Sequence, residues 1–123
     1  MPPSHAKHMS VTIYHNPRCA KSRETLRILE SRGIRPAVIE YLKDPPSEAS
    51  LRELIRLLGI TPCDLVRSKE PEFKQAGLDN PSCTDADVIQ ALARFPKLIE
   101  RPIVVKGRKA ALGRPPGSVI KIL

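Results

Sequence analysis

Two short apolar runs separated by one uninterrupted segment constrain the fold of this chain more than any other feature. The first run covers residues 11–14 and the second covers residues 37–42, and both are rich in β-branched and aromatic side chains. Such runs are typical of strands. Residues 20–32 between them contain no Pro or Gly, and Gly33 follows where a helix is expected to end. A single helix between two strands predicts a βαβ crossover with parallel pairing.

The middle of the chain is predicted to be helical. After Ser47, one helical face is apolar because its large side chains recur at helical spacing: Leu51, Leu54, Ile55 and Leu58. Residues 63–77 are polar and interrupted by Pro71, which indicates short helical turns. Thr84 is expected to cap a further helix that ends near Phe95, just before Pro96.

The last part of the chain returns to strands. Residues 103–105 and 110–112 predict a hairpin, and Pro115-Pro116 begins a final short helix. Together with the parallel pair, this order predicts an α/β fold with a small mixed sheet flanked by helices. We expect one domain over residues 10–123 and interpret residues 1–9 as an N-terminal extension or expression remnant.

The net positive charge of the chain favours the binding of small anions. Lys and Arg number 21 against 13 acidic residues, which gives a net charge of +8 and attracts anions. Aromatic residues make up only 3% of the chain, there is no Trp, and the basic residues are scattered, so we expect no nucleic-acid partner. Arg side chains match the oxygens of small oxyanions well.

The sequence also lacks the features expected of an exported protein or a membrane protein. No apolar run is long enough to span a bilayer, and residues 1–10 do not resemble a secretory signal, so we expect a cytoplasmic protein without membrane contact. Its three cysteines should therefore remain reduced. They include no close pair, so we expect neither a disulfide framework nor a metal site.

Cys19 is the candidate catalytic residue. It lies between the first strand and the following helix, where free N–H groups favour a thiolate. Nearby cationic side chains should lower its pKa further: Arg18, Lys21, Arg23 and His15. The spacing Cys19-x-x-Ser22 lacks the second thiol of a dithiol oxidoreductase. A low-molecular-weight phosphatase would have an Arg six residues after its catalytic cysteine, and this chain has Thr25 at that position.

Four segments resemble the glutaredoxin-coupled arsenate reductase family: VTIYHNPRCAKS at 11–22, LVRSKEP at 65–71, ERPIVV at 100–105 and GRPP at 113–116. The likeness extends over residues 10–123, and the short C-terminus resembles an arsenate reductase-like subgroup. The resemblance implies a thioredoxin-like fold with an inserted helical region. It also implies site residues: Cys19 as the nucleophile; Arg67, Arg101 and Arg114 as anion ligands; His15 and Ser22 as residues that tune the thiol; and a cis Pro102 facing it. Cys63 and Cys83 match no motif and are interpreted as incidental or packing cysteines, and a role as resolving thiols stays open as the alternative.

The expected activity is reduction of arsenate to arsenite, with glutathione as co-substrate, glutaredoxin as partner and no tightly bound cofactor. Two alternatives stay open. One is a glutathione-dependent thiol reductase acting on another substrate, in which three anion-binding arginines would have no purpose. The other is a redox-sensing regulator that binds RNA polymerase, although such regulators use Cys-x-x-Cys where this chain has Ser22.

Overall fold

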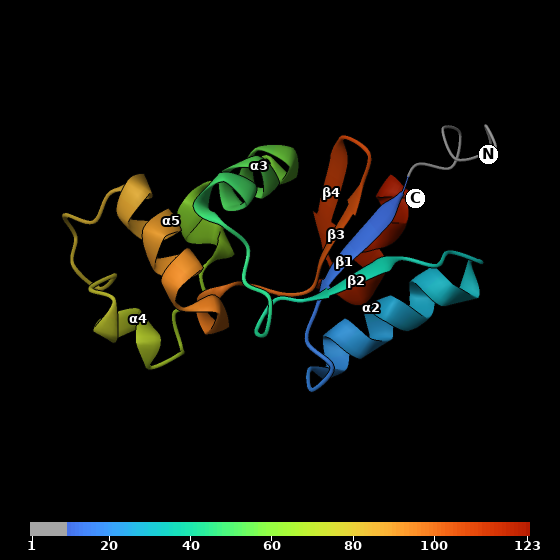
Figure 1. Cartoon of the computed structure of the whole chain (residues 1–123), viewed down its shortest axis with the longest axis horizontal. Helices are drawn as coiled ribbons and strands as arrows, with labels where there is room; N and C mark the ends of the chain where they lie inside the picture. The colour runs from blue at the N-terminus through green and yellow to red at the C-terminus, as the bar shows by residue number, and fades with distance from the viewer. Residues whose placement is uncertain (1–9) are drawn as a thin grey trace. The chain divides into compact units, whose positions relative to one another are not determined.

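The computed structural model describes residues 10–123, so the interpretation of residues 1–9 lies outside the described part of the chain. The chain divides into two compact units (Figure 1). The first unit combines the chain up to Glu40 with Arg101–Leu123, and the second is Tyr41–Glu100. The second unit is thus inserted into the first between two of its strands. No helix within residues 10–123 is long and apolar enough to cross a membrane.

The first unit is built on a four-stranded mixed sheet. Its elements are β1 (Val11–His15), α2 (Ala20–Ser31), β2 (Ala37–Glu40), β3 (Ile103–Lys106), β4 (Lys109–Leu112) and the 3-10 helix η3 (Pro116–Ile122). The strand order is β2-β1-β3-β4. β1 pairs in parallel with β2 and antiparallel with β3, and β3 and β4 form the hairpin. The second strand ends two residues earlier than expected, because Glu40 pairs with His15, the last residue of β1.

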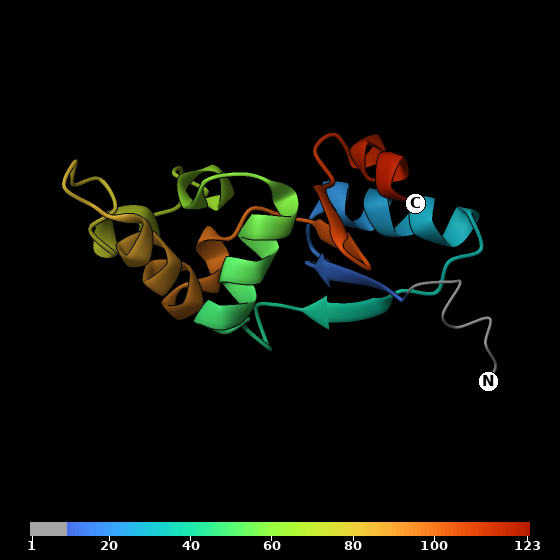
Figure 2. The same cartoon turned by 90° about the horizontal axis from the view of Figure 1, so that it is seen from above.

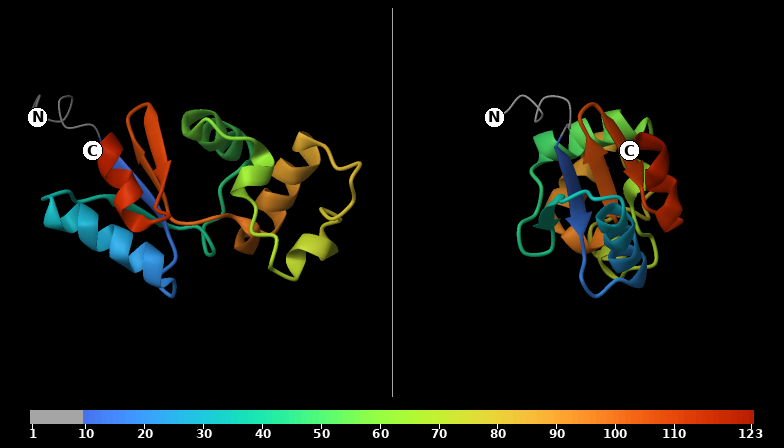
Figure 3. Two further views of the ribbon diagram at one scale, coloured as in Figure 1. Left: turned by 180° about the vertical axis from the view of Figure 1, so that it is seen from behind. Right: turned by 90° about the vertical axis from the view of Figure 1, so that its right-hand side faces the viewer.

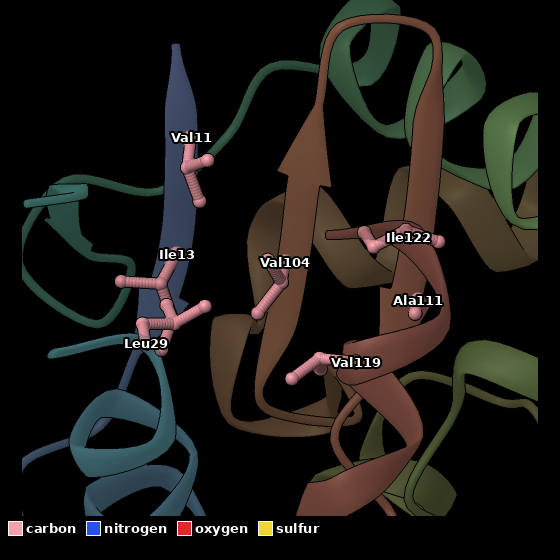
Figure 4. Close-up of a cluster of buried hydrophobic side chains, with 7 residues drawn as sticks. All are labelled: Val11, Ile13, Leu29, Val104, Ala111, Val119 and Ile122. Atoms are coloured by element: carbon pink, nitrogen blue, oxygen red, sulfur yellow. The ribbon is translucent and has the colours of Figure 1, made fainter. Parts of the chain in front are cut away.

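The core of the first unit lies between the sheet and the two helices α2 and η3, which cover the same face of it (Figure 2). Alternate side chains of β1 are buried, as expected for a strand with one covered face. Seven buried residues form the cluster drawn in Figure 4: Val11, Ile13, Leu29, Val104, Ala111, Val119 and Ile122. The last helix is therefore needed to complete this core.

The second unit is helical. It contains α3 (Glu48–Leu58), η1 (Pro62–Leu65), α4 (Glu72–Gln75), α5 (Asp85–Arg94) and η2 (Pro96–Leu98). Ser47 caps α3 by accepting a hydrogen bond from the Ser50 N–H at 3.1 Å, and Gly59 ends it with a φ of 68°. α3 and α5 pack against each other (Figure 3), and η1 packs against α5. A single β-bridge joins Val66 to Ile99.

Candidate active site

Cys19 occupies the N-cap position of α2. Its backbone is extended, with φ −94° and ψ 122°, as is usual for a residue that precedes the first helical turn. The Cys19 N–H donates to the Asn16 carbonyl at 2.9 Å, and the Cys19 carbonyl accepts from the Arg23 N–H at 2.9 Å. Only 9% of the residue is exposed. The turn after β1 therefore holds the sulfur at the positive end of a twelve-residue helix.

The surroundings of the thiol favour its ionised form. Burial alone raises the pKa of Cys19, but the backbone N–H groups of Ser22 and Lys21 and the side chain of Arg101 oppose this effect, and the pKa lies below that of an ordinary cysteine. The Cys19 side chain does not cap α2 with a hydrogen bond. The backbone N–H groups of Ser22 and Lys21 nevertheless stabilise a negative charge on its sulfur. The first turn of α2 contains no acidic residue.

The cations expected to act on Cys19 are not the ones that lower its pKa. Arg18 and Arg23 are exposed, and Arg23 Nη1 donates to the Pro17 carbonyl at 3.0 Å. Lys21 contributes through its backbone N–H instead of its ammonium group, while Arg101 reaches the sulfur from the segment that precedes β3. The electrostatic environment of Cys19 is thus set by helix position and by a residue 82 positions further along the chain.

His15 and Ser22 form a buried hydrogen-bonded pair beside the cysteine. Ser22 Oγ lies 2.6 Å from His15 Nδ1 and also accepts from the Asn16 N–H at 3.0 Å. Burial lowers the pKa of His15, the negative charge of Glu40 opposes this shift, and Arg23 adds to it. The net shift favours neutral His15, whose Nδ1 can accept the Ser22 O–H. This pair ties the end of β1 to the first turn of α2.

Arg101 and Arg114 lie in the same unit as Cys19. Arg114 Nη1 donates to the Arg101 carbonyl at 3.5 Å, so the segments before β3 and after β4 meet. The Arg101–Pro102 peptide bond is cis. The Arg114–Pro115 bond is also cis, and this bond was not predicted from the sequence. Two of the three candidate anion ligands thus come from the two ends of the β3–β4 hairpin.

Gly113 is a packing residue beside the candidate site that was not among the predicted site residues. Its N–H donates to the Pro102 carbonyl at 2.9 Å. A Cβ at this position would lie 2.5 Å from Thr25 Oγ1 and 2.6 Å from Pro102 Cγ, closer than van der Waals contact allows. Only glycine therefore lets the end of β4 pack against Pro102 and α2. Its place directly after a strand and before Arg114 was the available signal.

Arg67, the third predicted anion ligand, belongs to the second unit. Its N–H donates to the Leu98 carbonyl at 2.8 Å, beside the bridge between Val66 and Ile99. The half-buried guanidinium lies 3.1 Å from a Glu70 carboxylate oxygen and 3.9 Å from Glu100. Arg67 is thus a fixed, paired cation within its own unit.

The residues described by the structure include no group of three or more His, Cys, Asp or Glu side chains placed to hold a metal ion. A pocket of about 470 Å³ lies in the second unit, and none of the predicted site residues lines it. Cys19 instead lies at the N-terminus of α2, a position that favours a bound negative charge, and Arg101 adds a positive charge there. The geometry fits attack by a thiolate on a small oxyanion.

Comparison with known proteins decides the family. The family model for ArsC matches residues 14–122. The chain belongs to the ArsC family. A Haemophilus influenzae protein named arsenate reductase is 45% identical over 116 residues, which are 94% of this chain and 100% of that protein. The Escherichia coli K12 protein YfgD, described as uncharacterized, is 47% identical over 114 residues, or 92% of this chain and 96% of that protein.

Solved structures of ArsC-family proteins agree with this assignment. Arsenate reductase from Vibrio cholerae matches with a TM-score of 0.90 and 48% identity, covering 94% of this chain and 98% of that one. The predicted family and the thioredoxin-like α/β fold are therefore confirmed.

Proposed function

We propose that this ArsC-family protein reduces arsenate to arsenite, with Cys19 as the nucleophile and glutathione as the reductant. The observation that carries the proposal is the environment of Cys19, where helix N–H groups and Arg101 stabilise a thiolate. Similarity to proteins named arsenate reductase, at 45% and 48% identity, supports arsenate as the oxyanion. A thiolate beside an arginine suits nucleophilic attack on an anion, because the cation offsets the approaching negative charge.

Arginine side chains would hold the arsenate. Arg101 stabilises the Cys19 thiolate, and Arg114 donates to the Arg101 carbonyl, so both belong to one local arrangement. Each guanidinium offers five N–H donors in a plane and stays charged, which suits recognition of several oxygens at once. The family resemblance assigns Arg67 as the third anion ligand, and we include it in the proposal on that basis.

The chemistry proceeds in two steps at sulfur. The Cys19 thiolate attacks arsenic, an S–As bond forms, and one arsenate oxygen leaves as water after protonation. A glutathione thiolate then attacks the Cys19 sulfur. The S–As bond breaks with its electron pair on arsenic, which passes from As(V) to As(III), and the two sulfurs are oxidised together to a mixed disulfide. Protonation of the arsenic oxygens gives arsenite.

The mixed disulfide requires a second thiol for turnover. Ser22 stands where a Cys-x-x-Cys motif would place a resolving cysteine, so the resolving thiol must come from outside the chain. Glutaredoxin would supply it by attacking the glutathione sulfur and releasing the Cys19 thiolate. No tightly bound cofactor is needed for these steps. A cycle that consumes reduced glutathione belongs in a reducing compartment, and we therefore place the protein in the cytoplasm.

The test is a coupled assay in which NADPH oxidation is followed with glutathione, glutaredoxin and glutathione reductase present. We expect an arsenate-dependent rate, and we expect Cys19→Ser to lower it about a thousandfold or more because the nucleophile is lost. A wild-type protein without an arsenate-dependent rate would contradict the proposal. Turnover of glutathione mixed disulfides without arsenate would indicate a general thiol reductase.

A further inference from the structure

The second unit contains a pair of cysteines that the proposed reaction does not use. Cys63 and Cys83 are 20 residues apart in the sequence, yet both line one pocket of about 230 Å³. The remaining lining is one hydroxyl side chain, Ser68, and four apolar side chains: Val66, Phe73, Leu78 and Val88. Cys63 is exposed and Cys83 is partly exposed, so both thiols are accessible to a small reagent.

Two capping boxes fix the backbone beside these cysteines. Cys63 lies in η1, where Asp64 Oδ2 accepts hydrogen bonds from the Thr61 N–H at 3.0 Å and from Thr61 Oγ1 at 3.1 Å. Cys83 directly precedes Thr84, the N-cap of α5, which exchanges hydrogen bonds with Asp87 at 3.0 and 3.2 Å. Because η1 packs against α5, the two anchored segments meet. The two thiols of the pocket therefore lie on backbone segments that hydrogen bonds hold in place.

We propose that Cys63 and Cys83 form a dithiol site that binds trivalent arsenic. Arsenite is neutral As(OH)₃ near pH 7, and each thiol condenses with one As–OH group, so that one S–As bond forms and one water leaves. Two thiols give a cyclic S–As–S product with one remaining hydroxyl and release two waters, and no oxidation state changes. The two links reinforce each other because the second forms within one molecule.

The thiol chemistry of the pair suits binding better than catalysis. Burial raises the pKa of Cys83, and the neighbouring charges of Asp87 and Cys63 raise it further. Cys83 Sγ also donates weakly to the Thr84 carbonyl at 4.0 Å. Cys83 is thus a protonated thiol near neutral pH and a poor nucleophile, whereas condensation with As(OH)₃ consumes neutral thiols. The pair complements Cys19, whose pKa is shifted in the opposite direction, below that of an ordinary cysteine.

The choice of arsenite as the ligand rests on the proposed function, because arsenite is the product of that reaction. The binding itself can be measured without the reaction, since arsenite is supplied directly. Arsenate-dependent NADPH oxidation by the unsubstituted protein is measured separately. Its absence would contradict arsenate reduction while leaving the arsenite titration to decide the dithiol site.

The experiment titrates the full chain carrying Cys19→Ser, reduced with a phosphine, with sodium arsenite. Intact-mass spectrometry and counting of free thiols should show one arsenic per chain and the loss of both thiols together. Adding Cys63→Ser or Cys83→Ser to this parent should weaken binding about a hundredfold or more, because either change leaves one link. The two single variants serve as matched controls for each other, and circular dichroism checks their folding.

A second readout needs no substitution. In the unsubstituted chain, saturating arsenite should protect Cys63 and Cys83 from alkylation to the same extent and at the same concentration. The proposal would be overturned if arsenite did not bind the Cys19→Ser chain, or if either single variant bound as tightly as its parent. Protection of only one of the two thiols would equally contradict it.

Discussion

Cys19 and Cys83 both lie at the start of a helix, yet their pKa values shift in opposite directions. Cys19 is itself the N-cap of α2, so helix N–H groups face its sulfur. Cys83 is one residue further out, because Thr84 takes the N-cap of α5. The backbone N–H groups of α2 thus lower the pKa of Cys19, whereas burial is the largest cause that raises the pKa of Cys83.

Charge increases the difference between the two cysteines. The first turn of α2 has no acidic residue, and Arg101 contacts the sulfur of Cys19. The first turn of α5 carries Asp85 and Asp87, and Asp87 raises the pKa of Cys83. A helix start is thus not sufficient to activate a cysteine. The cap position and the sign of the neighbouring charges must agree.

The packing that places Arg101 beside Cys19 can be tested at Gly113. We expect Gly113→Ala to lower the free energy of unfolding by about 1–3 kcal/mol, since the new methyl group would press on Thr25 and Pro102. Urea unfolding followed by circular dichroism measures this change. The matched control is Gly117→Ala, where a Cβ meets nothing within 4 Å, and it should be nearly neutral. Equal stability of both variants would mean that Gly113 does not fix this contact.

The second prediction concerns Arg101, whose charge and side chain lower the pKa of Cys19. Arg101→Lys keeps the charge but loses the planar set of donors, and we expect turnover of arsenate to fall about tenfold or more, since ~1.4 kcal/mol suffices for that factor. We expect the same direction for Arg67→Lys and Arg114→Lys. The coupled NADPH assay measures all three variants.

Arg52→Lys is the control for these substitutions. Arg52 is exposed on α3, where it lies 3.8 Å from Glu48, and its replacement should leave turnover unchanged. Wild-type rates in all three site variants would show that the arginines attract anions only through net charge.

The smallest expected effect concerns His15 and pH. Because burial lowers the pKa of His15, with Glu40 opposing and Arg23 adding to the shift, the unfolded chain binds a proton at this residue more readily than the folded one. The contribution of neutral His15 to the free energy of unfolding is complete above its pKa in the unfolded chain, about 6.5. This contribution is lost as the pH falls from there through the lower pKa of His15 in the folded chain. We expect His15→Gln to lose less stability than the wild type between about pH 7.5 and 5 in urea unfolding. Identical losses in the two proteins would contradict the assigned shift.

Much of the fold could be predicted because hydrophobic spacing and turn residues specify it locally. The βαβ crossover, the hairpin and the helix after Ser47 all depend on patterns within a few residues. The position of Cys19 between a strand and a helix followed from the same patterns. These features needed no knowledge of distant contacts.

The missed features are those that depend on distant contacts. Gly113 meets Thr25, and Cys63 shares a pocket with Cys83, although each pair is well separated in the sequence. Arg18 and Arg23 flank Cys19, but at a helix start their side chains are exposed, while Arg101 comes from another segment. Periodicity predicts which face of an element is buried and does not predict which partner it meets.

The central claim, that cap position and Arg101 lower the pKa of Cys19, is tested most directly by the pH dependence of alkylation. Iodoacetamide labelling of the native protein, resolved by peptide mass spectrometry, gives a separate midpoint for each cysteine. We predict a midpoint for Cys19 below that of free cysteine, about 8.5, and a midpoint for Cys83 above it. A Cys19 midpoint at or above the free value, or faster labelling of Cys83 than of Cys19 at neutral pH, would contradict the account.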